Sequence, residues 1–133
     1  MTDNPSPGCF ACGPDHPAGL RLAFTLDHAG RTARAHTVLA ATFAGADGIA
    51  HGGIIATLLD EAMVHASRTV VPLAATAKLT VRYRHPVPVG VPLDLDAAVL
   101  SCRHGAVRCT ARIRHAGELL AEAEATLLVV ETN

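Results

Sequence analysis

Aromatic residues are scarce in this sequence: they make up 3% of its 133 residues, and tryptophan is absent. Half of the residues are nevertheless hydrophobic, so the core must be aliphatic, built from Ala, Val, Leu and Ile. A chain of this length buries a substantial core of its own, and we expect a single domain.

The sequence also lacks charge of one sign and long apolar runs. Its formal net charge is −1 at pH 7 and no long run of like charge occurs, which argues against a nucleic-acid-binding surface. The apolar runs are far shorter than the roughly eighteen residues that a membrane span needs. Residues 1–7 lack the basic and apolar regions of a secretory signal. We therefore expect a soluble, cytoplasmic protein that binds neither nucleic acid nor membrane.

A second pair of cysteines at metal-site spacing is missing. Cys9 and Cys12 form a C-x-x-C motif, but a zinc ribbon needs another such pair. Cys102 and Cys109 suit facing strands of a hairpin better. In a chain without an export signal reduced thiols are the default, so we expect structural thiols and no metal. A metal site completed by His16 or by a second subunit, and redox chemistry, are the alternatives.

Motifs of several enzyme classes are absent as well. The sequence contains no G-x-x-x-x-G-K loop, no G-x-G-x-x-G turn and no H-E-x-x-H helix. Nucleotide hydrolysis, dinucleotide redox chemistry and zincin chemistry therefore have no support.

The most informative stretch begins at His51, where two glycines precede an apolar run without Gly or Pro. Apolar residues recur at helical spacing nearly all round the axis, which predicts a buried helix of about four to five turns. We expect it to end near Val70, because Pro72 cannot donate to the helical ladder. A helix with apolar residues on so many sides needs more cover than one sheet provides, so we expect a dimer.

Glycine amides and carboxylates give this helix its chemistry. Gly52 and Gly53 put free N–H groups and the positive end of the helix dipole where a ligand oxygen can approach. Asp60 and Glu61 point about 100° apart around the axis, and a buried carboxylate is costly unless it is paired, bonded or employed. Such amides and a carboxylate two turns along are typical of an acyl-transfer site. The alternatives are close packing for the glycines and a structural, hydrogen-bonded acid for Asp60.

Period-two alternation predicts strands on both sides of the helix. Residues 1–18, rich in proline and glycine, read as an irregular arm, and residues 19–133 as one domain. The element order predicts an α+β fold, with one long central helix wrapped by a curved antiparallel sheet of about six strands. The expected strands are residues 20–26, 32–43, 76–85, 93–102, 106–115 and 119–130.

Three stretches carry a resemblance to a known family. They are HGG with the following IIATLLDEA from residue 51, TAKLTVRYRHPVPVG from residue 76, and the leader CFACGPDHPAGL from residue 9. With the element order, they resemble the hotdog-fold acyl-CoA thioesterases, specifically the PaaI-like group, over nearly the whole chain. The resemblance implies hydrolysis of an acyl-CoA thioester to a carboxylic acid and free coenzyme A, with no metal or organic cofactor.

The resemblance also implies catalytic roles. The Gly52 amide polarises the thioester carbonyl, Asp60 is nucleophile or general base, and Thr76 assists the carboxylate or positions water. The site forms across a two-fold dimer, with residues 51–53 of one subunit facing Asp60 of the other, in a homodimer or homotetramer. Gly45 departs from the pattern, because many relatives carry Asn or Gln there; either another group does that job or the rate is modest.

Further residues are candidates for substrate binding. We expect His51 to shape the loop rather than transfer a proton, and Gly53 to offer a second amide. Glu61 is expected to pair with an arginine across the interface, with a role as substitute base as the alternative, and His65 to lie in the core or interface. Guanidinium groups suit the phosphates of coenzyme A, and the candidates are Arg82, Arg84 and Arg103.

Two other functions remain open on the same fold. A non-catalytic acyl-CoA or lipid binder would keep the pocket without the chemistry. A hydratase or dehydratase is less favoured, because the D-x-N-x-x-H pattern expected for it is absent.

Overall fold

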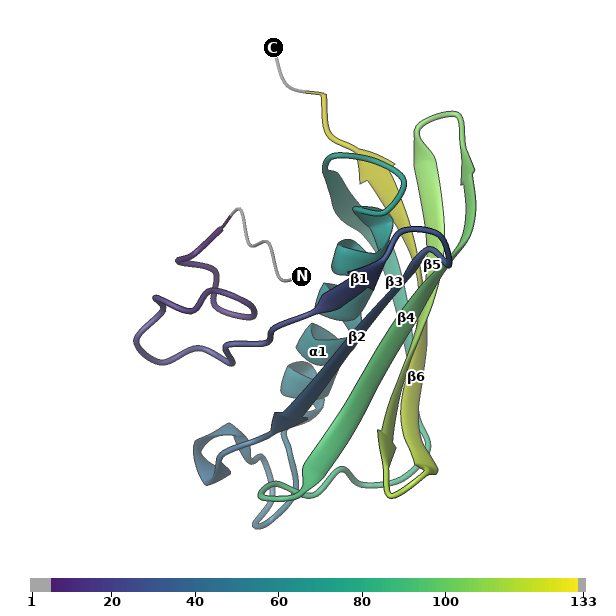
Figure 1. Ribbon diagram of the computed structural model, residues 1–133. Helices are drawn as coiled ribbons and strands as arrows, with labels where there is room; N and C mark the ends of the chain where they lie inside the picture. Colours follow the sequence, from purple (N-terminus) through teal and green to yellow (C-terminus); the bar gives the residue numbers. More distant parts are fainter. Residues whose placement is uncertain (1–5, 132–133) are drawn as a thin grey trace.

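One long helix packs against one face of a six-stranded sheet in the computed structural model (Figure 1). The structure describes residues 6–131; the first five residues of the predicted arm and the last two of the chain lie outside this range. The elements are β1 (Thr25–Asp27), β2 (Thr32–Val38), a 3₁₀ helix η1 (Ala41–Phe43), α1 (Gly52–Ser67), β3 (Ala74–Tyr83), β4 (Pro92–Arg103), β5 (Ala106–His115) and β6 (Glu118–Val129).

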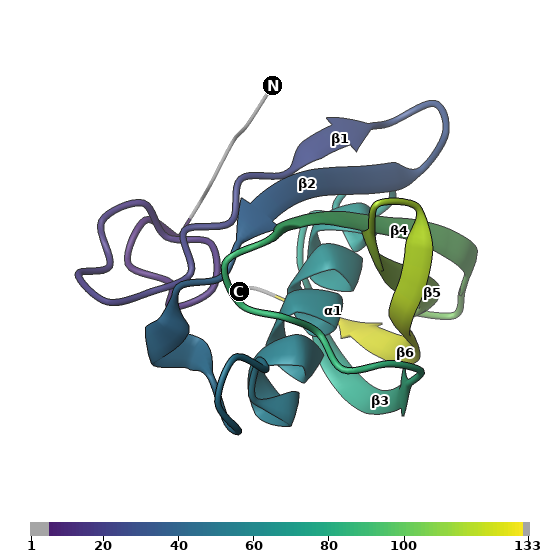
Figure 2. The ribbon, with the colours of Figure 1, turned by 90° about the horizontal axis from the view of Figure 1, so that it is seen from below.

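The sheet is antiparallel throughout, with strand order β1-β2-β4-β5-β6-β3. Seen along the helix, it curves around α1, and the arm lies to one side of the helix and of β1 and β2 (Figure 2). The predicted α+β architecture, one long helix wrapped by about six antiparallel strands, is confirmed.

The buried side of α1 forms the centre of an aliphatic core. Leu58, Leu59, Ala62, Met63 and Ala66 have no exposed surface, and alternate residues of β4, β5 and β6 pack against them. The other side of the helix is half-exposed in the single chain, at Ala56, Thr57, Asp60, Glu61 and Val64. The sheet therefore covers α1 from one side and the arm lies against Glu61 and Val64, while the surface with Ala56, Thr57 and Asp60 is open to another partner.

Two hairpin turns each contain a glycine at their second position. His104-Gly105 joins β4 to β5 and Ala116-Gly117 joins β5 to β6, and all four residues have positive φ. Two-residue turns with positive φ at both positions match the twist of the flanking strands. Cys102 and Cys109 lie on the paired strands β4 and β5, as expected.

The first predicted strand is wrong over most of its length. Residues 20–24 keep the predicted alternation of buried and exposed side chains, but their backbone does not join the sheet. The N–H groups of Leu20 and Leu22 donate to the carbonyls of Phe10 and Ala11, at 2.8 and 2.9 Å. The arm thus takes these hydrogen bonds, and pairing with β2 begins at Thr25.

Three other elements have boundaries that differ from the prediction by two residues or more, among them β3, which covers residues 74–83 rather than 76–85. β2 ends at Val38, residues 39–40 are irregular, and residues 41–43 form η1. Helix α1 ends at Ser67, three residues early, and the N–H groups of Val70 and Val71 both donate to the Ser67 carbonyl in the following turn. Within residues 6–131, no helix combines the length and hydrophobicity needed to cross a membrane.

Candidate active site

His51 is the N-cap of α1. Its backbone is extended, with φ −62° and ψ 137°, and its imidazole Nδ1 accepts a hydrogen bond of 2.9 Å from the Gly53 N–H. This bond occupies one of the donors that a helix N-terminus leaves without intrahelical partners. The structure therefore gives His51 a positioning contact and leaves Gly53 with its amide engaged.

Gly52, by contrast, offers a free amide. Among residues 6–131, no hydrogen bond from the Gly52 N–H is found, and the residue is exposed. Its carbonyl accepts a 2.7 Å hydrogen bond from the Tyr83 hydroxyl. A Cβ at this position would be 3.6 Å from that hydroxyl oxygen, an ordinary contact. Packing inside the chain therefore does not demand glycine here, which weighs against the close-packing alternative for Gly52.

Asp60 lies two turns along the helix and is held by the sheet. The Thr76 hydroxyl donates a 2.6 Å hydrogen bond to Asp60 Oδ1. No described residue hydrogen-bonds to Oδ2. The structure thus brings Asp60 and Thr76 together and leaves one carboxylate oxygen available for chemistry.

A β-bulge explains how Thr76 reaches the helix. Simple alternation puts Ala77 on the same face as Leu79 and Val81, and Thr76 on the opposite, outer face. The pairing with β6 shifts by one residue between Thr76 and Lys78, so that Ala77 is extra. Bulges re-aim side chains in this way. Thr76 therefore shares the helix-facing side with Leu79, where it meets Asp60.

The environment of Asp60 favours its neutral form. Burial raises the pKa of the Asp60 carboxyl, the neighbouring Glu61 charge raises it further, and the hydrogen bond from Thr76 opposes both, with a net upward shift. A raised carboxyl pKa in a partly exposed position is typical of acid–base sites.

Glu61 faces a different set of partners. Its Oε1 lies 3.2 Å from His65 Nε2, and the Cys12 thiol also hydrogen-bonds to it. Burial alone would raise the pKa of Glu61, but the contacts with His65 and Cys12 outweigh burial and lower it. His65 is buried, as expected, and its ring stacks on Phe24 with centroids 4.6 Å apart. Within the chain, the partners of Glu61 are therefore a histidine and a thiol, and the arginine partner stays a prediction about the interface.

Two grooves flank the start of α1. One, of about 360 Å³, is lined by Ile49, Ala50, Gly52, Ile55, Tyr83, Arg84, His85, Pro86 and Val87. The other, of about 450 Å³, is lined by Thr42, Phe43, Ala44, His51, Gly53, Ile54 and Thr57. The first is rich in aliphatic side chains, whereas the second mixes apolar and polar ones, and they open beside Gly52 and Gly53.

The predicted arginines divide between the site and the outer surface. Arg84 lines the groove beside Gly52 and pairs with Glu122 at 2.6 Å. Arg82 is exposed and is paired in register with Glu122 across the strands, and Arg103 is exposed at the end of β4. The structure thus brings Arg84, and neither of the other two, to the start of α1.

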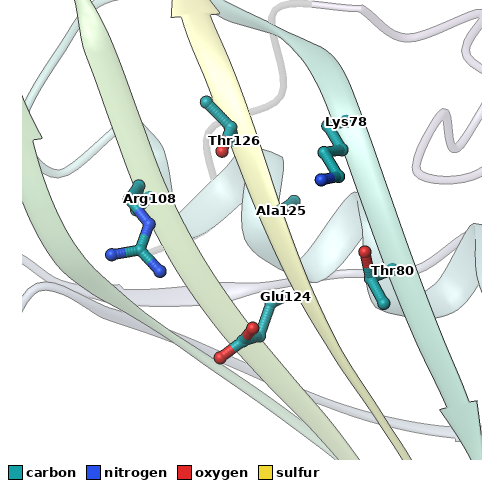
Figure 3. A pocket seen from close by; sticks show the side chains of 6 residues that line it. All are labelled: Lys78, Thr80, Arg108, Glu124, Ala125 and Thr126. Carbon is teal, nitrogen blue, oxygen red and sulfur yellow. The ribbon is translucent and has the colours of Figure 1, made fainter.

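The outer face of the sheet carries a separate polar pocket of about 230 Å³ (Figure 3). Its lining residues are Lys78, Thr80, Arg108, Glu124, Ala125 and Thr126. These side chains come from β3, β5 and β6, and α1 lies behind the sheet. The pocket therefore does not communicate with Asp60 through the single chain.

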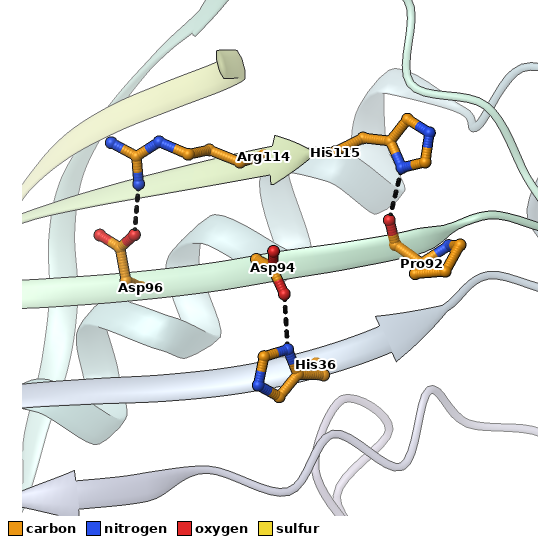
Figure 4. A network of polar contacts seen from close by, with 6 residues as sticks. All are labelled: His36, Pro92, Asp94, Asp96, Arg114 and His115. Carbon is orange, nitrogen blue, oxygen red and sulfur yellow. Dashed lines mark hydrogen bonds and ion pairs between the residues drawn. The ribbon is translucent and has the colours of Figure 1, made fainter. Parts of the chain in front are cut away.

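A row of polar contacts crosses β2, β4 and β5 elsewhere on the sheet (Figure 4). His36 bonds to Asp94, Arg114 to Asp96 at 2.7 Å, and the His115 ring to the Pro92 carbonyl. The two side-chain pairs are between a third and nine-tenths exposed, and such surface pairs contribute little to stability. They belong to the sheet surface rather than to the candidate site.

Sequence reasoning missed Tyr83 and the contacts of the arm with Glu61. Alternation makes Tyr83 one more residue of a strand face, and no periodicity indicates that its hydroxyl reaches Gly52. The structure does not place His16 with Cys9 and Cys12, as the alternative of a metal site completed by His16 requires. The ligand atoms of Cys9, Cys12 and Glu61 cluster instead, while His16 Nδ1 accepts from the Ala18 N–H.

Comparison with known proteins assigns this sequence to a family. The family model described as the thioesterase superfamily matches residues 47–121. An acyl-coenzyme A thioesterase from Xenopus laevis, THEM4, is 31% identical over 87 residues, which are 65% of this chain and 39% of the relative. The chain thus spans well under half the length of that relative.

Solved structures agree with this assignment. Protein RHA08564, a thioesterase superfamily protein, aligns with a TM-score of 0.83 and 27% identity over 91% of this chain and 62% of that chain. A variant of the phenylacetic acid degradation protein PaaI from Thermus thermophilus aligns with a TM-score of 0.76 and 23% identity over 84% and 95% of the two chains. At 23% identity, this second likeness shows a shared fold alone. The predicted hotdog fold is confirmed.

The raised pKa of Asp60 makes a prediction about stability. Below the aspartate pKa of about 3.9 in unfolded chains, the carboxyl is neutral in both states and contributes nothing by ionisation. As pH rises from there through the raised folded pKa, the unfolded chain ionises first and the free energy of unfolding falls. Asp60→Asn removes this loss, so the variant gains stability relative to wild type between acid and neutral pH.

Urea unfolding of both proteins across this pH range measures the difference in unfolding free energy. A difference in unfolding free energy that stays constant with pH, or that shrinks as pH rises, would contradict a raised pKa of Asp60 in the folded chain.

Proposed function

The chain belongs to the thioesterase superfamily, and on that basis we propose that it hydrolyses acyl-CoA thioesters to carboxylic acids and free coenzyme A. The observation that carries the proposal is the placement of two functional groups along α1. The first residue of the helix, Gly52, offers a free amide. Two turns later comes Asp60, and the Thr76 hydroxyl donates a hydrogen bond to its carboxylate.

Gly52 is proposed to bind the thioester carbonyl oxygen. As attack turns this carbonyl into a tetrahedral oxyanion, an N–H at the positive end of a helix stabilises the developing charge. Removing one such donor costs on the order of 3–4 kcal/mol of barrier in other enzymes. Support comes from the Gly52 N–H, which has no partner among residues 6–131, and from the Tyr83 hydroxyl, which donates to the Gly52 carbonyl.

Asp60 is proposed to start the attack, by one of two routes. As general base, it takes a proton from water while the water oxygen bonds to the carbonyl carbon, and the C–S bond then breaks. As nucleophile, its own oxygen bonds to that carbon, coenzyme A leaves as thiolate, and water hydrolyses the resulting anhydride. In both routes the thiolate takes up a proton to give free coenzyme A.

Two chains are proposed to build each site. Gly52 and Asp60 are eight positions apart on α1, which separates them by roughly 12 Å along the axis. A single thioester carbonyl cannot touch both within one chain. The half-exposed side of α1 that includes Asp60 suits a second copy related by a two-fold axis, with Gly52 of one copy facing Asp60 of the other. The outer edge of β3, unpaired within residues 6–131, suits continuation of the sheet into that copy.

The substrate groups have matching places beside α1. The grooves flanking the helix start are proposed to take the acyl chain, because aliphatic side chains line much of the one beside Gly52 and Phe43 and Ile54 give the other an apolar part. Arg84, at the rim of one groove, is the proposed partner for a coenzyme A phosphate, and Arg82 is a more distant candidate. Arginine forks suit phosphate oxygens, although Arg84 must share its guanidinium with Glu122.

A non-catalytic acyl-CoA binder is the second candidate function, and Gly45 favours it. A Cβ at this position would be 3.3 Å from the His51 Cα, so the amide side chain that the family resemblance implies here fits only if His51 shifts. The chain therefore lacks one group that would hold the carbonyl or the attacking water.

Thiol release from a panel of short, long and aromatic acyl-CoAs separates the two functions. We expect wild type to release free coenzyme A and Asp60→Asn to lose about 10²- to 10⁴-fold in kcat, the range for a missing general base. Size-exclusion chromatography checks that the oligomer is unchanged. Tight binding of one panel member without thiol release would identify a binder, and equal turnover by both proteins would reject Asp60.

The hydroxyl of Thr76 should set the pH profile. Its hydrogen bond lowers the pKa of Asp60 against the effect of burial, so Thr76→Ala raises that pKa and moves the acid limb of kcat/KM to higher pH. Activity then falls most at low pH and recovers as pH rises. Thr76→Ser, the matched control, keeps the hydroxyl and the wild-type limb. A pH-independent loss in Thr76→Ala would show that Thr76 acts in another way.

A further inference from the structure

Three groups that can ligate a metal, two from the arm and one from α1, meet where the arm lies against the helix. The thiols of Cys9 and Cys12 and the carboxylate of Glu61 have their ligand atoms within 4.8 Å of one another. We call these three residues the thiol–carboxylate cluster. The proposed hydrolysis uses none of the three side chains.

The arm is shaped to present both thiols on one side. The Cys9 N–H donates to the Ser6 carbonyl at 2.9 Å, and the Gly13 N–H donates to the Cys9 carbonyl at 2.8 Å. A Cβ at Gly13 would be 2.4 Å from the Cys9 backbone nitrogen. Glycine is therefore required for the turn to close, and the sequence reads C-x-x-C-G, with the cysteine spacing used by structural zinc sites.

The helix side of the cluster is fixed as well. His65 Nε2 lies 3.2 Å from Glu61 Oε1, and the imidazole is buried and stacked on Phe24. A carboxylate ligand that is oriented by a further hydrogen bond is usual in metal sites. Glu61 is thus held toward the thiols before any ion arrives.

We propose that the thiol–carboxylate cluster binds one zinc ion. Thiolates favour Zn²⁺ over Mg²⁺ or Ca²⁺, and two thiolates with one carboxylate fill three of the four positions that zinc prefers. Binding releases the two thiol protons to solvent. The three anionic ligands then leave the occupied site with a net charge of −1, and a water molecule completes the tetrahedron.

The ion joins the arm to the helix that carries the candidate site. Cys9 and Cys12 belong to the arm, and Glu61 is the residue after Asp60. Because Glu61 points away from Asp60 around the helix, the metal serves structure: it fixes the arm over α1. The free energy of metal binding then adds to the stability of the folded chain.

Two simpler states of the same residues are possible outcomes. Neither cysteine is part of a disulfide in the structure, and the Cys12 thiol hydrogen-bonds to Glu61. The cluster can therefore be a metal-free hydrogen-bonded group, or Cys9 and Cys12 can close a disulfide under oxidising conditions. Each state predicts a metal content that differs from that of a zinc site.

Metal content of the full chain, purified without chelator and kept reduced, tests the proposal. We expect about one zinc per chain by mass spectrometry of the metal. Cobalt replacing zinc should give tetrahedral visible bands and thiolate-to-cobalt charge-transfer absorption. Cys9→Ser and Cys12→Ser should lose the ion, and Glu61→Gln should bind Co²⁺ at least about tenfold more weakly. Cys102→Ser, an exposed cysteine outside the cluster, is the matched control and should bind normally.

Thermal unfolding with and without added zinc keeps the test independent of expression yield. The melting temperature should rise with zinc in wild type and Cys102→Ser, and stay unchanged in folded Cys9→Ser and Cys12→Ser. Three results would each overturn the proposal. The first is less than about one-tenth zinc per chain together with no cobalt spectrum. The others are metal retained by both cysteine variants and a Cys9–Cys12 disulfide in protein kept reduced. None of these readouts depends on thioester hydrolysis, so the two proposals fail separately.

Discussion

The hydrogen bond from Thr76 to Asp60 joins the helix to the sheet at the point where the candidate chemistry lies. A half-buried carboxylate costs stability, and its burial raises its pKa. The Thr76 hydroxyl offsets part of this cost and orients the side chain at 2.6 Å. The bond exists because one extra residue in β3 turns Thr76 toward the helix. A local irregularity in the sheet therefore supports the group on which the proposed reaction depends.

The two sides of α1 explain why one chain has the parts of a site without completing it. Its buried side is mostly aliphatic and packs against the sheet and the segment before β1, which fixes the helix axis. Its other side presents Asp60 half-exposed, while the free Gly52 amide lies at the helix start, roughly 12 Å away along the axis. A rigid helix cannot bring these groups closer. Pairing with a second copy is the simplest way to bring an amide and a carboxylate to the same carbonyl.

Much of this could be predicted from the sequence. The 3.6-residue and two-residue periods predict α1 and the three strands β4, β5 and β6 with small boundary errors, because each has one consistently buried face. The acid at position 60 and the glycines at the helix start follow from the same pattern and from the family resemblance. The roles assigned to them remain proposals.

The remainder depends on tertiary contacts that no local pattern encodes. Alternation along β3 assigns Ala77 to the helix-facing side, and the bulge gives that side to Thr76. The residues after the arm alternate like a strand, but the arm itself competes for their backbone hydrogen bonds. The meeting of Cys9, Cys12 and Glu61 depends on how the arm folds over α1, which spacing along the chain does not specify. Tyr83 likewise reaches Gly52 from 31 positions along the chain.

A mixed-oligomer experiment tests the two-chain site most directly. Gly52→Pro removes the amide N–H at the first helical position, where proline is tolerated and where the extended backbone of His51 suits a following proline. Gly52→Pro and Asp60→Asn should each be inactive alone. Unfolded together and refolded, they should regain about one quarter of wild-type turnover, because half of the two-fold dimers then contain one intact site. A mixture no more active than either variant would contradict a site shared between Gly52 of one chain and Asp60 of the other.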